Sequence, residues 1–153
     1  LFYSSGAMAT EGNHEIVLKA LSQLGNVGGE PYWTWYGFNY RIEWCACFVS
    51  WCAYQCGYVQ SGSVPSFISC KVGIDWFKAH NQWKGRSYTP KSGDYIFFDW
   101  EPDGVADHIG IVDYYENGYV YTVEGNSSDT CRTKSYSIDD SCIYGFAVPN
   151  FKK

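Results

Sequence analysis

The sequence is poor in charge, in basic runs and in long apolar stretches. Charged residues make up 18% of the 153-residue chain, and the formal net charge is −5. Lys and Arg form no cluster that would bind a phosphate backbone, so we expect no nucleic-acid partner. No apolar run approaches the roughly 18 residues that span a bilayer, so we expect no membrane span. A charged start followed by an apolar segment, the mark of a secretion signal, is also missing.

Aromatic residues, by contrast, are abundant and indicate a folded chain. The sequence holds 7 Trp, 14 Tyr and 9 Phe, which excludes a disordered or coiled-coil protein. Its length predicts a single domain, and we expect a monomer with one active site. The opening LFYSSGAMAT contains GAMA, which resembles the remainder of a cleaved expression tag. We therefore predict a tag or linker at residues 1–10 and the single domain at residues 11–153.

The number of cysteines is odd, so at least one is expected to be a free thiol. The seven are Cys45, Cys47, Cys52, Cys56, Cys70, Cys131 and Cys142. If one of them is catalytic, the other six allow fifteen pairings, among which the sequence does not choose. They can equally be small buried apolar residues. Their frequency favours a location outside the cytoplasm, where disulfides persist.

The first half of the chain carries helical signals. We predict helices over residues 13–25, 44–57 and 72–79, the first of them capped by Asn13 and ended by Gly25. Residues 28–40 mix Gly, Pro and bulky aromatics without periodicity, which predicts a loop packed by its own side chains. On the second helix one face carries Cys45, Phe48, Val49, Cys52 and Cys56, and the opposite face carries Cys47, Ser50 and Tyr54.

The second half carries strand signals. Aromatic or β-branched runs bounded by turn residues predict strands over residues 94–99, 108–115, 119–124 and 143–148. Helices followed by antiparallel strands are typical of the α+β class, with N-terminal helices packed on a C-terminal sheet.

Cys45 is the first candidate for chemistry. It lies in the first turn of a predicted helix, where unpaired N–H groups and the helix dipole lower the pKa of a thiol. A buried structural cysteine is the ordinary alternative for any single cysteine. Cys47 faces the other way and is not expected to serve as the nucleophile.

Three polar residues on two predicted strands are the next candidates. His108 begins a strand, and Gly110 after it would allow a helix to approach that face. Glu124 and Asn126 end the following strand, and either could accept a hydrogen bond from the histidine ring and fix its tautomer. Taken singly, each has an ordinary explanation as a strand-end or turn residue.

Taken together, these segments resemble the CHAP amidase family of the NlpC/P60 papain-like superfamily. The resemblance covers nearly the whole chain and is carried by ALSQLGNVGG, WCACFVSWCAYQCG, KSGDYIFFDW, DHIGIVDYYENGYVYTVEGN and YGFAVPNF. It implies a papain-like fold with Cys45 as nucleophile, His108 as general base and acid, Glu124 as orienting residue and Asn126 as a further polar site residue. It also implies a peptidoglycan hydrolase, either an N-acetylmuramoyl-L-alanine amidase or an endopeptidase.

The resemblance implies further expectations about ligands and location. Some phage members bind calcium through an Asp-rich loop before the nucleophile, but residues 32–43 contain no Asp, so we expect no metal there and no cofactor. Peptidoglycan is the expected partner, which places the protein outside a bacterial cell or on its surface, with any signal peptide beyond this sequence. The candidate groove aromatics are Trp33, Trp35, Tyr36, Trp44 and Trp100, each of which has core packing as its alternative.

The predicted site also selects a hairpin register. With a two-residue Asn117-Gly118 turn, Glu116 would pair with Tyr119 and His108 with Ser127, and Glu124 would face the opposite side of the sheet. A three-residue turn pairs Tyr115 with Tyr119 and sets His108 opposite Asn126 and Gly110 opposite Glu124. Val112 then pairs with Thr122, and Tyr114 with Val120. We therefore predict the three-residue turn, with the polar groups on the face that the Cys45 helix covers.

Three other functions compete with this one. A cysteine-stapled, aromatic-rich wall-binding module would have Cys45 in a disulfide and no thiol reactivity. A zinc site is a poor match, because the C-x-C spacing and one distant histidine do not form a ligand set. A protease or transglutaminase acting on protein would use the same triad on another amide.

Overall fold

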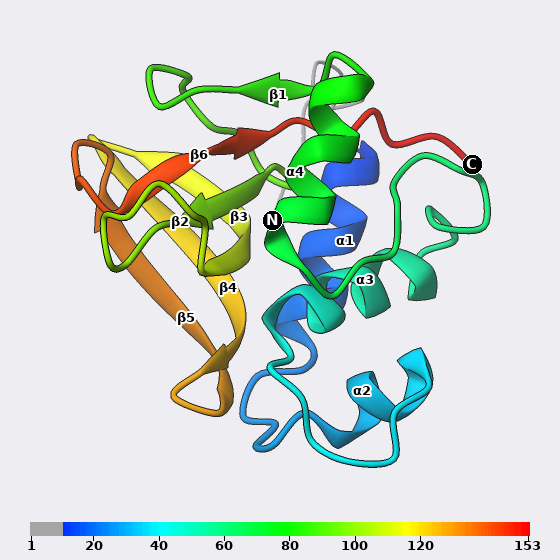
Figure 1. Cartoon of the computed structure of the whole chain (residues 1–153). Coiled ribbons are helices and arrows are strands. Elements are labelled where there is room, and N and C mark those ends of the chain that lie inside the picture. The colour runs from blue at the N-terminus through cyan, green and yellow to red at the C-terminus, as the bar shows by residue number, and fades with distance from the viewer. Residues whose placement is uncertain (1–10) are drawn as a thin grey trace.

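The computed structural model describes residues 11–153, in which the helices gather on one side of a curled antiparallel sheet (Figure 1). The helices are α1 (Glu11–Leu21), α2 (Glu30–Tyr36), α3 (Cys45–Gln55) and α4 (Cys70–Ala79). The strands are β1 (Trp83–Lys84), β2 (Tyr95–Phe98), β3 (His108–Glu116), β4 (Tyr119–Ser127), β5 (Thr130–Ser137) and β6 (Ile143–Ala147), in the order β1-β6-β2-β3-β4-β5. The predicted α+β class is confirmed, whereas the predicted tag lies outside the described residues.

The helix α3 is the centre of the main core. Its apolar residues face β3 and β4, and Phe48 is fully buried there. The opposite side of α3 is buried as well: the Cys47 thiol donates a hydrogen bond to the Tyr32 carbonyl at 3.1 Å, and the Ser50 hydroxyl donates to the Phe67 carbonyl at 3.0 Å. The predicted orientation of Cys47 is therefore correct, although it faces other protein rather than water. In the described part of the chain, no helix has both the length and the apolar character to cross a bilayer.

Two predictions in the first half of the chain are wrong. Helix α1 begins at Glu11, so Asn13 lies inside the helix rather than capping it. The predicted loop over residues 28–40 contains α2. Pro31 explains this helix, because proline is preorganised for the first turn and the missing N–H would be unpaired there anyway. The left-handed Gly29, with φ 69°, turns the chain into it.

Two strands were not predicted. β5 reads TCRTKSYS and shows only Cys131 and Tyr136 as buried side chains, so its sequence lacks the apolar alternation of a half-buried strand. It exists because it pairs with β4 along the length of that strand. β1 has two residues and pairs with β6. Both strands therefore form because they pair with neighbouring strands, and their own sequences do not predict them.

The β3–β4 hairpin ends in a two-residue turn, which contradicts the predicted three-residue turn. Asn117 and Gly118 both have positive φ, 53° and 82°, and Glu116 pairs with Tyr119. These angles belong to the type I′ turn that Asn-Gly favours, because its twist matches that of the strands. Tyr114 consequently pairs with Tyr121 and not with Val120.

A β-bulge at Asp113 then corrects the register. Beyond the irregularity between Val112 and Tyr114, Val112 pairs with Thr122 and Ile111 with Val123, as predicted for this end of the hairpin. The extra residue that the prediction placed in the turn therefore lies within β3. The strand ends that carry the candidate site residues keep the register that the site requires.

Two glycines show which face of the sheet α3 covers and which face Glu124 occupies. A Cβ at Gly110 would lie 2.8 Å from Glu124 Cγ, and a Cβ at Gly125 would lie 2.6 Å from Phe48 Cβ. Gly125 therefore admits α3, whereas Gly110 makes room for Glu124, contrary to the prediction that Gly110 admits the helix. The prediction that α3 covers the face of His108 and Glu124 is also wrong, because alternate residues of β3 and β4 face opposite sides.

Candidate active site

Cys45 is the first residue of α3 and reaches the end of the sheet from the helix N-terminus. Trp44 precedes it at the N-cap position. Its side chain accepts no hydrogen bond from the first N–H groups of the helix. The side chain of Cys45 is buried except for 7% of its surface. It meets the side chains of Cys70 and His108 and the backbone N–H of Ile109.

These contacts make Cys45 unlike an ordinary buried thiol. A hydrogen bond from Cys70 holds the pKa of Cys45 well below its usual value, against burial, which would raise it. A hydrogen bond and the charge of His108 lower the pKa further, as does the N–H of Ile109. The thiolate is therefore the favoured form at this position, and the thiolate is the nucleophilic form of cysteine.

His108 begins β3 and links Cys45 to Glu124. Its Nε2 atom lies 2.9 Å from Glu124 Oε1, so the other ring nitrogen, Nδ1, remains for the sulfur of Cys45. Burial lowers the pKa of His108, but the hydrogen bonds and charges of Cys45 and Glu124 overcome it and raise the pKa to about 9. The three groups favour a thiolate–imidazolium pair with a carboxylate behind it.

Glu124 is fixed by two hydroxyl groups as well as by the histidine. Its Oε2 atom accepts hydrogen bonds from Thr122 Oγ1 at 2.6 Å and from the Tyr136 hydroxyl at 2.7 Å. Burial raises the pKa of this carboxyl, but the bonds from His108, Thr122 and Tyr136 lower it below its usual value. The carboxylate is thus ionised, 1% exposed and held in one orientation.

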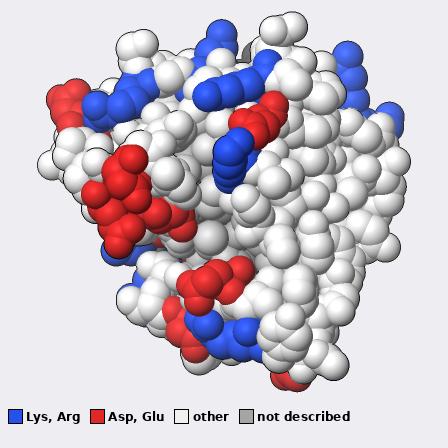
Figure 2. Space-filling view, viewed as in Figure 1, with Lys and Arg blue, Asp and Glu red and all other residues white. Residues whose placement is uncertain are grey.

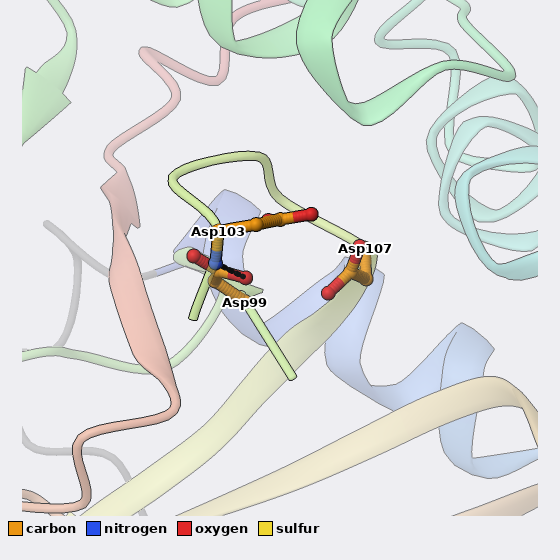
Figure 3. A group of neighbouring side chains, drawn as sticks. All are labelled: Asp99, Asp103 and Asp107. Atoms are coloured by element: carbon orange, nitrogen blue, oxygen red, sulfur yellow. Dashed lines mark hydrogen bonds between the residues drawn. The ribbon is translucent and has the colours of Figure 1, made fainter. Parts of the chain in front are cut away.

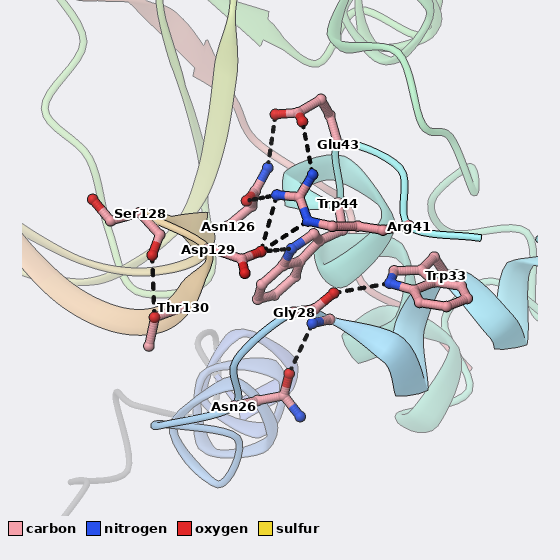
Figure 4. Close-up of polar contacts among 11 residues, drawn as sticks. Asn26, Gly28, Trp33, Arg41, Glu43, Trp44, Asn126, Ser128, Asp129 and Thr130 are labelled. Carbon is pink, nitrogen blue, oxygen red and sulfur yellow. Dashed lines mark hydrogen bonds and ion pairs between the residues drawn. The ribbon is translucent and has the colours of Figure 1, made fainter.

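Asn126 does not join this set, contrary to the prediction. Its backbone is left-handed, with φ 57°, and its side chain binds Arg41 and Glu43 instead of the histidine (Figure 4). Asn126 Oδ1 accepts a bond from Arg41 Nη2 at 3.0 Å, and Asn126 Nδ2 donates to Glu43 Oε1 at 3.0 Å. Arg41 also donates to Asp129 at 2.9 Å and to Glu43 at 3.1 Å. This network joins the segment before α3 to the turn after β4.

Among the five aromatic candidates, Trp100 lies beside the histidine. Its ring centroid is 5.8 Å from that of His108, and 41% of its surface is exposed. Trp44 is wrong as a substrate contact, because it is fully buried and its indole N–H donates to Asp129. Trp33 donates to the Gly28 carbonyl at 2.8 Å and is packed against the core (Figure 4).

The remaining two aromatic candidates belong to α2, which packs against α3. Trp35 packs on Tyr54 with ring centroids 5.1 Å apart. Tyr54 lies nine residues after Cys45, which is about 13 Å along the helix axis. Tyr36 stacks on Phe38. The structure therefore does not bring Trp35 to the nucleophile.

The loop between β2 and β3 leads directly into His108 and is acidic. Carboxylate atoms of Asp99, Asp103 and Asp107 lie within 4.8 Å of one another (Figure 3). Asp99 accepts N–H bonds from Asp103 and Gly104, and Asp107 accepts the N–H of Trp100 at 2.7 Å. These bonds fold the loop and place Trp100 over the site.

A groove of about 240 Å³ lies next to this loop. It runs between Lys71, Ile74 and Lys78 of α4 and residues 104–106. Its walls follow Cys70 and precede His108 in the sequence, although neither of these residues lines it. Figure 2 shows acidic side chains in several places on this face, one cluster lying over the β2–β3 loop and others beside basic side chains, whereas most of the right half of the view is uncharged.

All seven cysteines are thiols in the structure. The wall-binding alternative requires Cys45 in a disulfide, and its free thiol beside His108 argues against that alternative. Cys47 is fully buried, and burial and the charge of Cys45 raise its pKa to about 12.

Comparison with known proteins identifies the family. The model of the CHAP domain matches residues 35–126, which is more than half of the chain and runs from the segment before Cys45 to Asn126. The chain belongs to the CHAP family. No curated protein matches this CHAP domain significantly.

Solved structures confirm that the CHAP domain has the predicted papain-like fold. A crystal structure of Ly7917 is similar with a TM-score of 0.59 and 16% identity, over 90% of this chain and 62% of that one. A structure described as Ly7917 with the hydrolyzing product of MDP gives 0.60 and 17%, with the same coverage. NlpC2 from Trichomonas vaginalis gives 0.58 and 16%, over 93% of this chain and 47% of that one. The chain spans less than two thirds of these proteins.

Sequence reasoning missed several residues around the CHAP site. Thr122 and Tyr136 hold Glu124, and the period of two along β4 signals Thr122 once Glu124 is chosen. Tyr136 carries no such signal, because β5 was not predicted. Arg41 and Asp129 lie 88 residues apart and have no local pattern that pairs them. Cys70 was counted among the cysteines, but nothing in the sequence places it against Cys45.

Proposed function

We propose that this CHAP domain is a cysteine hydrolase that cleaves an amide bond of bacterial peptidoglycan. The observation that carries the proposal is the hydrogen-bonded series Cys45–His108–Glu124 at one end of the sheet. In this series Cys45 is the nucleophile, His108 the general base and acid, and Glu124 the orienting residue. These are the three roles of a nucleophile, its base and the group that orients the base.

The mechanism follows from the protonation states. The Cys45 thiolate attacks the amide carbonyl, and the imidazolium of His108 gives its proton to the departing amine. The resulting thioester is then attacked by a water molecule whose proton His108 accepts. Glu124 keeps the ring in position and stabilises its charged form through both steps.

The start of α3 supplies the group that stabilises the developing oxyanion. Backbone N–H groups in the first turn have no partner within the helix, and the N–H of Cys45 is one of them. They lie next to the sulfur and carry the positive end of the helix dipole. We assign the oxyanion to this turn.

Two observations support peptidoglycan as the substrate. The chain belongs to the CHAP family, and a structure with the same fold is described with the hydrolyzing product of MDP. The groove beside α4 and the exposed face of Trp100 provide a surface on which a peptide or sugar can lie. The bond cut is either the amide that joins the glycan to its peptide or one within the peptides, and the domain at residues 11–153 acts as a monomer outside the cytoplasm.

Digestion of purified peptidoglycan tests this function. Mass spectrometry of the products distinguishes new N-terminal amines within the peptides, the mark of an endopeptidase, from a freed lactyl group, the mark of an amidase. The matched control is Cys45→Ala, which keeps the fold and removes the nucleophile. If wild-type protein releases neither product, or Cys45→Ala releases as much, the proposed function is wrong.

A further inference from the structure

A second thiol lies against the candidate nucleophile. Cys70 is the first residue of α4, as Cys45 is of α3, and their side chains are joined by a hydrogen bond. We propose that Cys45 and Cys70 form a reversible disulfide when the protein meets a peroxide, so that Cys70 protects the nucleophile from irreversible oxidation. The inference rests on the proposed function for its effect on lysis, but the disulfide itself requires no hydrolase activity.

The position of Cys70 is set by the local structure around it. Ser69 caps α4, with its Oγ accepting the N–H of Val72 at 3.3 Å. Because the capped turn fixes the backbone of residue 70, its thiol is held where it meets Cys45. The exposed fractions are 9% for Cys70 and 7% for Cys45, so a small oxidant meets the pair at an edge of the surface.

The chemistry of the two sulfurs is complementary. Cys45 favours the thiolate, which is the form that reacts with peroxide. The hydrogen bond to Cys45 and burial both raise the pKa of Cys70, so Cys70 keeps its proton and does not compete as the first target. A thiolate next to a protonated thiol is the arrangement of a peroxide-sensitive cysteine and the cysteine that resolves its sulfenic acid.

The other cysteines are less suited to resolve an oxidised Cys45. Cys47 donates its thiol hydrogen to the Tyr32 carbonyl and faces away from the site. Cys52 is fully buried in the middle of α3. Cys142 is partly exposed and lies near the carboxyl groups of Asp140 and Asp99 rather than near Cys45.

The reaction balances with hydrogen peroxide as the named oxidant. The Cys45 thiolate attacks one peroxide oxygen, the O–O bond breaks, and Cys45 becomes a sulfenic acid while hydroxide leaves and takes up a proton to give water. The Cys70 sulfur then attacks the Cys45 sulfur, the S–O bond breaks, and a second water leaves with the proton of Cys70. The two thiols lose two electrons in total, and a dithiol such as dithiothreitol returns them.

Mass spectrometry of the oxidised protein tests the disulfide directly. Reduced full-length protein is treated with hydrogen peroxide, blocked with N-ethylmaleimide and digested without reductant. Chymotrypsin is needed, because cleavage by trypsin at Arg41 and Lys71 would leave both cysteines in one peptide. We expect residues 45–48 cross-linked to residues 68–76, with fragmentation spectra placing the bond on Cys45 and the N-ethylmaleimide label on Cys47. Dithiothreitol should release both peptides.

Variants show whether Cys70 protects the nucleophile. In Cys70→Ser and, as a second variant, Cys70→Ala, we expect peroxide to take Cys45 to the sulfinic or sulfonic acid, which dithiothreitol does not reverse. Cys142→Ser is the matched control and should form the disulfide as the wild type does. Circular dichroism shows which variants are folded, and the wild-type cross-link needs no variant at all.

Each outcome decides the inference. A wild-type protein without the Cys45–Cys70 peptide pair, or with Cys45 joined to Cys47, overturns it. Equal irreversible oxidation of Cys45 in wild-type protein and in both Cys70 variants overturns the protective role. If the cross-link forms but untreated protein does not digest peptidoglycan, the proposed function fails and the disulfide stands.

Discussion

Cys45 and Cys52 lie two turns apart on the same helix, and both are buried, yet the pKa values of their thiols are shifted in opposite directions. At Cys45 hydrogen bonds from Cys70, His108 and the N–H of Ile109 overcome burial and lower the pKa. At Cys52 burial acts first, the charge of Cys131 adds to it, and the pKa rises well above the usual value. Burial therefore does not decide the reactivity of a cysteine in this protein. The hydrogen-bond donors that α4 and β3 bring to the first turn of α3 decide it.

Removal of the sulfur gives the largest effect. We expect Cys45→Ala to lower peptidoglycan hydrolysis by about 10³-fold or more, because no other group can form the thioester. Cys52→Ala, the matched variant on the same helix, should keep its activity once its folded fraction is allowed for. Turbidity loss of wall suspensions measures both, and substantial lysis by Cys45→Ala would contradict the role of this residue.

Alkylation at low pH sharpens the same comparison. At pH 6 we expect iodoacetamide to label Cys45 at least about 10²-fold faster than Cys52 or Cys47, since the pKa of Cys45 is lowered whereas those of Cys52 and Cys47 are raised. Peptide mass spectrometry of timed samples gives the rates, and preferential labelling of Cys47 would identify a different nucleophile.

Loss of the carboxylate should weaken the ion pair without removing the sulfur. Glu124→Gln keeps the shape but removes the charge that favours the imidazolium, so we expect activity to fall by about 10²-fold. The pKa of His108 should fall from about 9 as well, which shifts the alkaline limit of activity to lower pH. A pH profile of kcat/KM measures both, and an unchanged profile would show that Glu124 does not orient the histidine.

The hydroxyl of Tyr136 should contribute less, because it acts through Glu124. Tyr136→Phe removes one bond to a charged acceptor, worth about 1.5–3 kcal/mol, so we expect a fall in kcat/KM of about tenfold. The alkaline limit should move in the same direction as in Glu124→Gln but by less. Thr122→Ser keeps the second hydroxyl and serves as the control, and a change in stability without a shift in the pH profile would make Tyr136 purely structural.

The smallest effect is expected at Cys47. Its thiol faces the Tyr32 carbonyl and not the substrate, so Cys47→Ala should leave kcat/KM within a few-fold of wild type. A lost buried hydrogen bond and a small cavity should lower the free energy of unfolding by about 1–2 kcal/mol. Chemical denaturation measures that change. A loss of activity as large as in Cys45→Ala would remove the distinction between the two cysteines.

The sequence predicts the three residues of the candidate site better than the contacts that support them. Cys45, His108 and Glu124 follow from helix and strand signals together with the family pattern, and the structure brings them together. The placement of Asn126 was wrong because its left-handed backbone redirects the side chain, a conformation that the residue type permits but does not dictate. The contact of Cys70 with Cys45 depends on how α4 is packed, which no local pattern specifies.

The sheet shows the same limit. The strands that carry apolar alternation were predicted, whereas β5 depends on a partner strand and was not. The hairpin prediction chose the correct pairing near Glu124 for a wrong reason, because it placed the extra residue in the turn instead of at Asp113. The expected site predicts which residues of β3 and β4 lie opposite each other. It does not predict where along the hairpin the extra residue lies.

The bulge at Asp113 also divides the hairpin into two parts with different pairing registers. Between the Asn117-Gly118 tip and the bulge, the pairing is set by the turn; beyond the bulge, it is set by the contacts of Val112 with Thr122 and of Glu124 with His108. A peptide tag or reporter spliced in at the tip would therefore alter the outer ladder and leave the spacing of the chemical groups unchanged. For anyone who wishes to immobilise or label this domain, the tip is a natural attachment point.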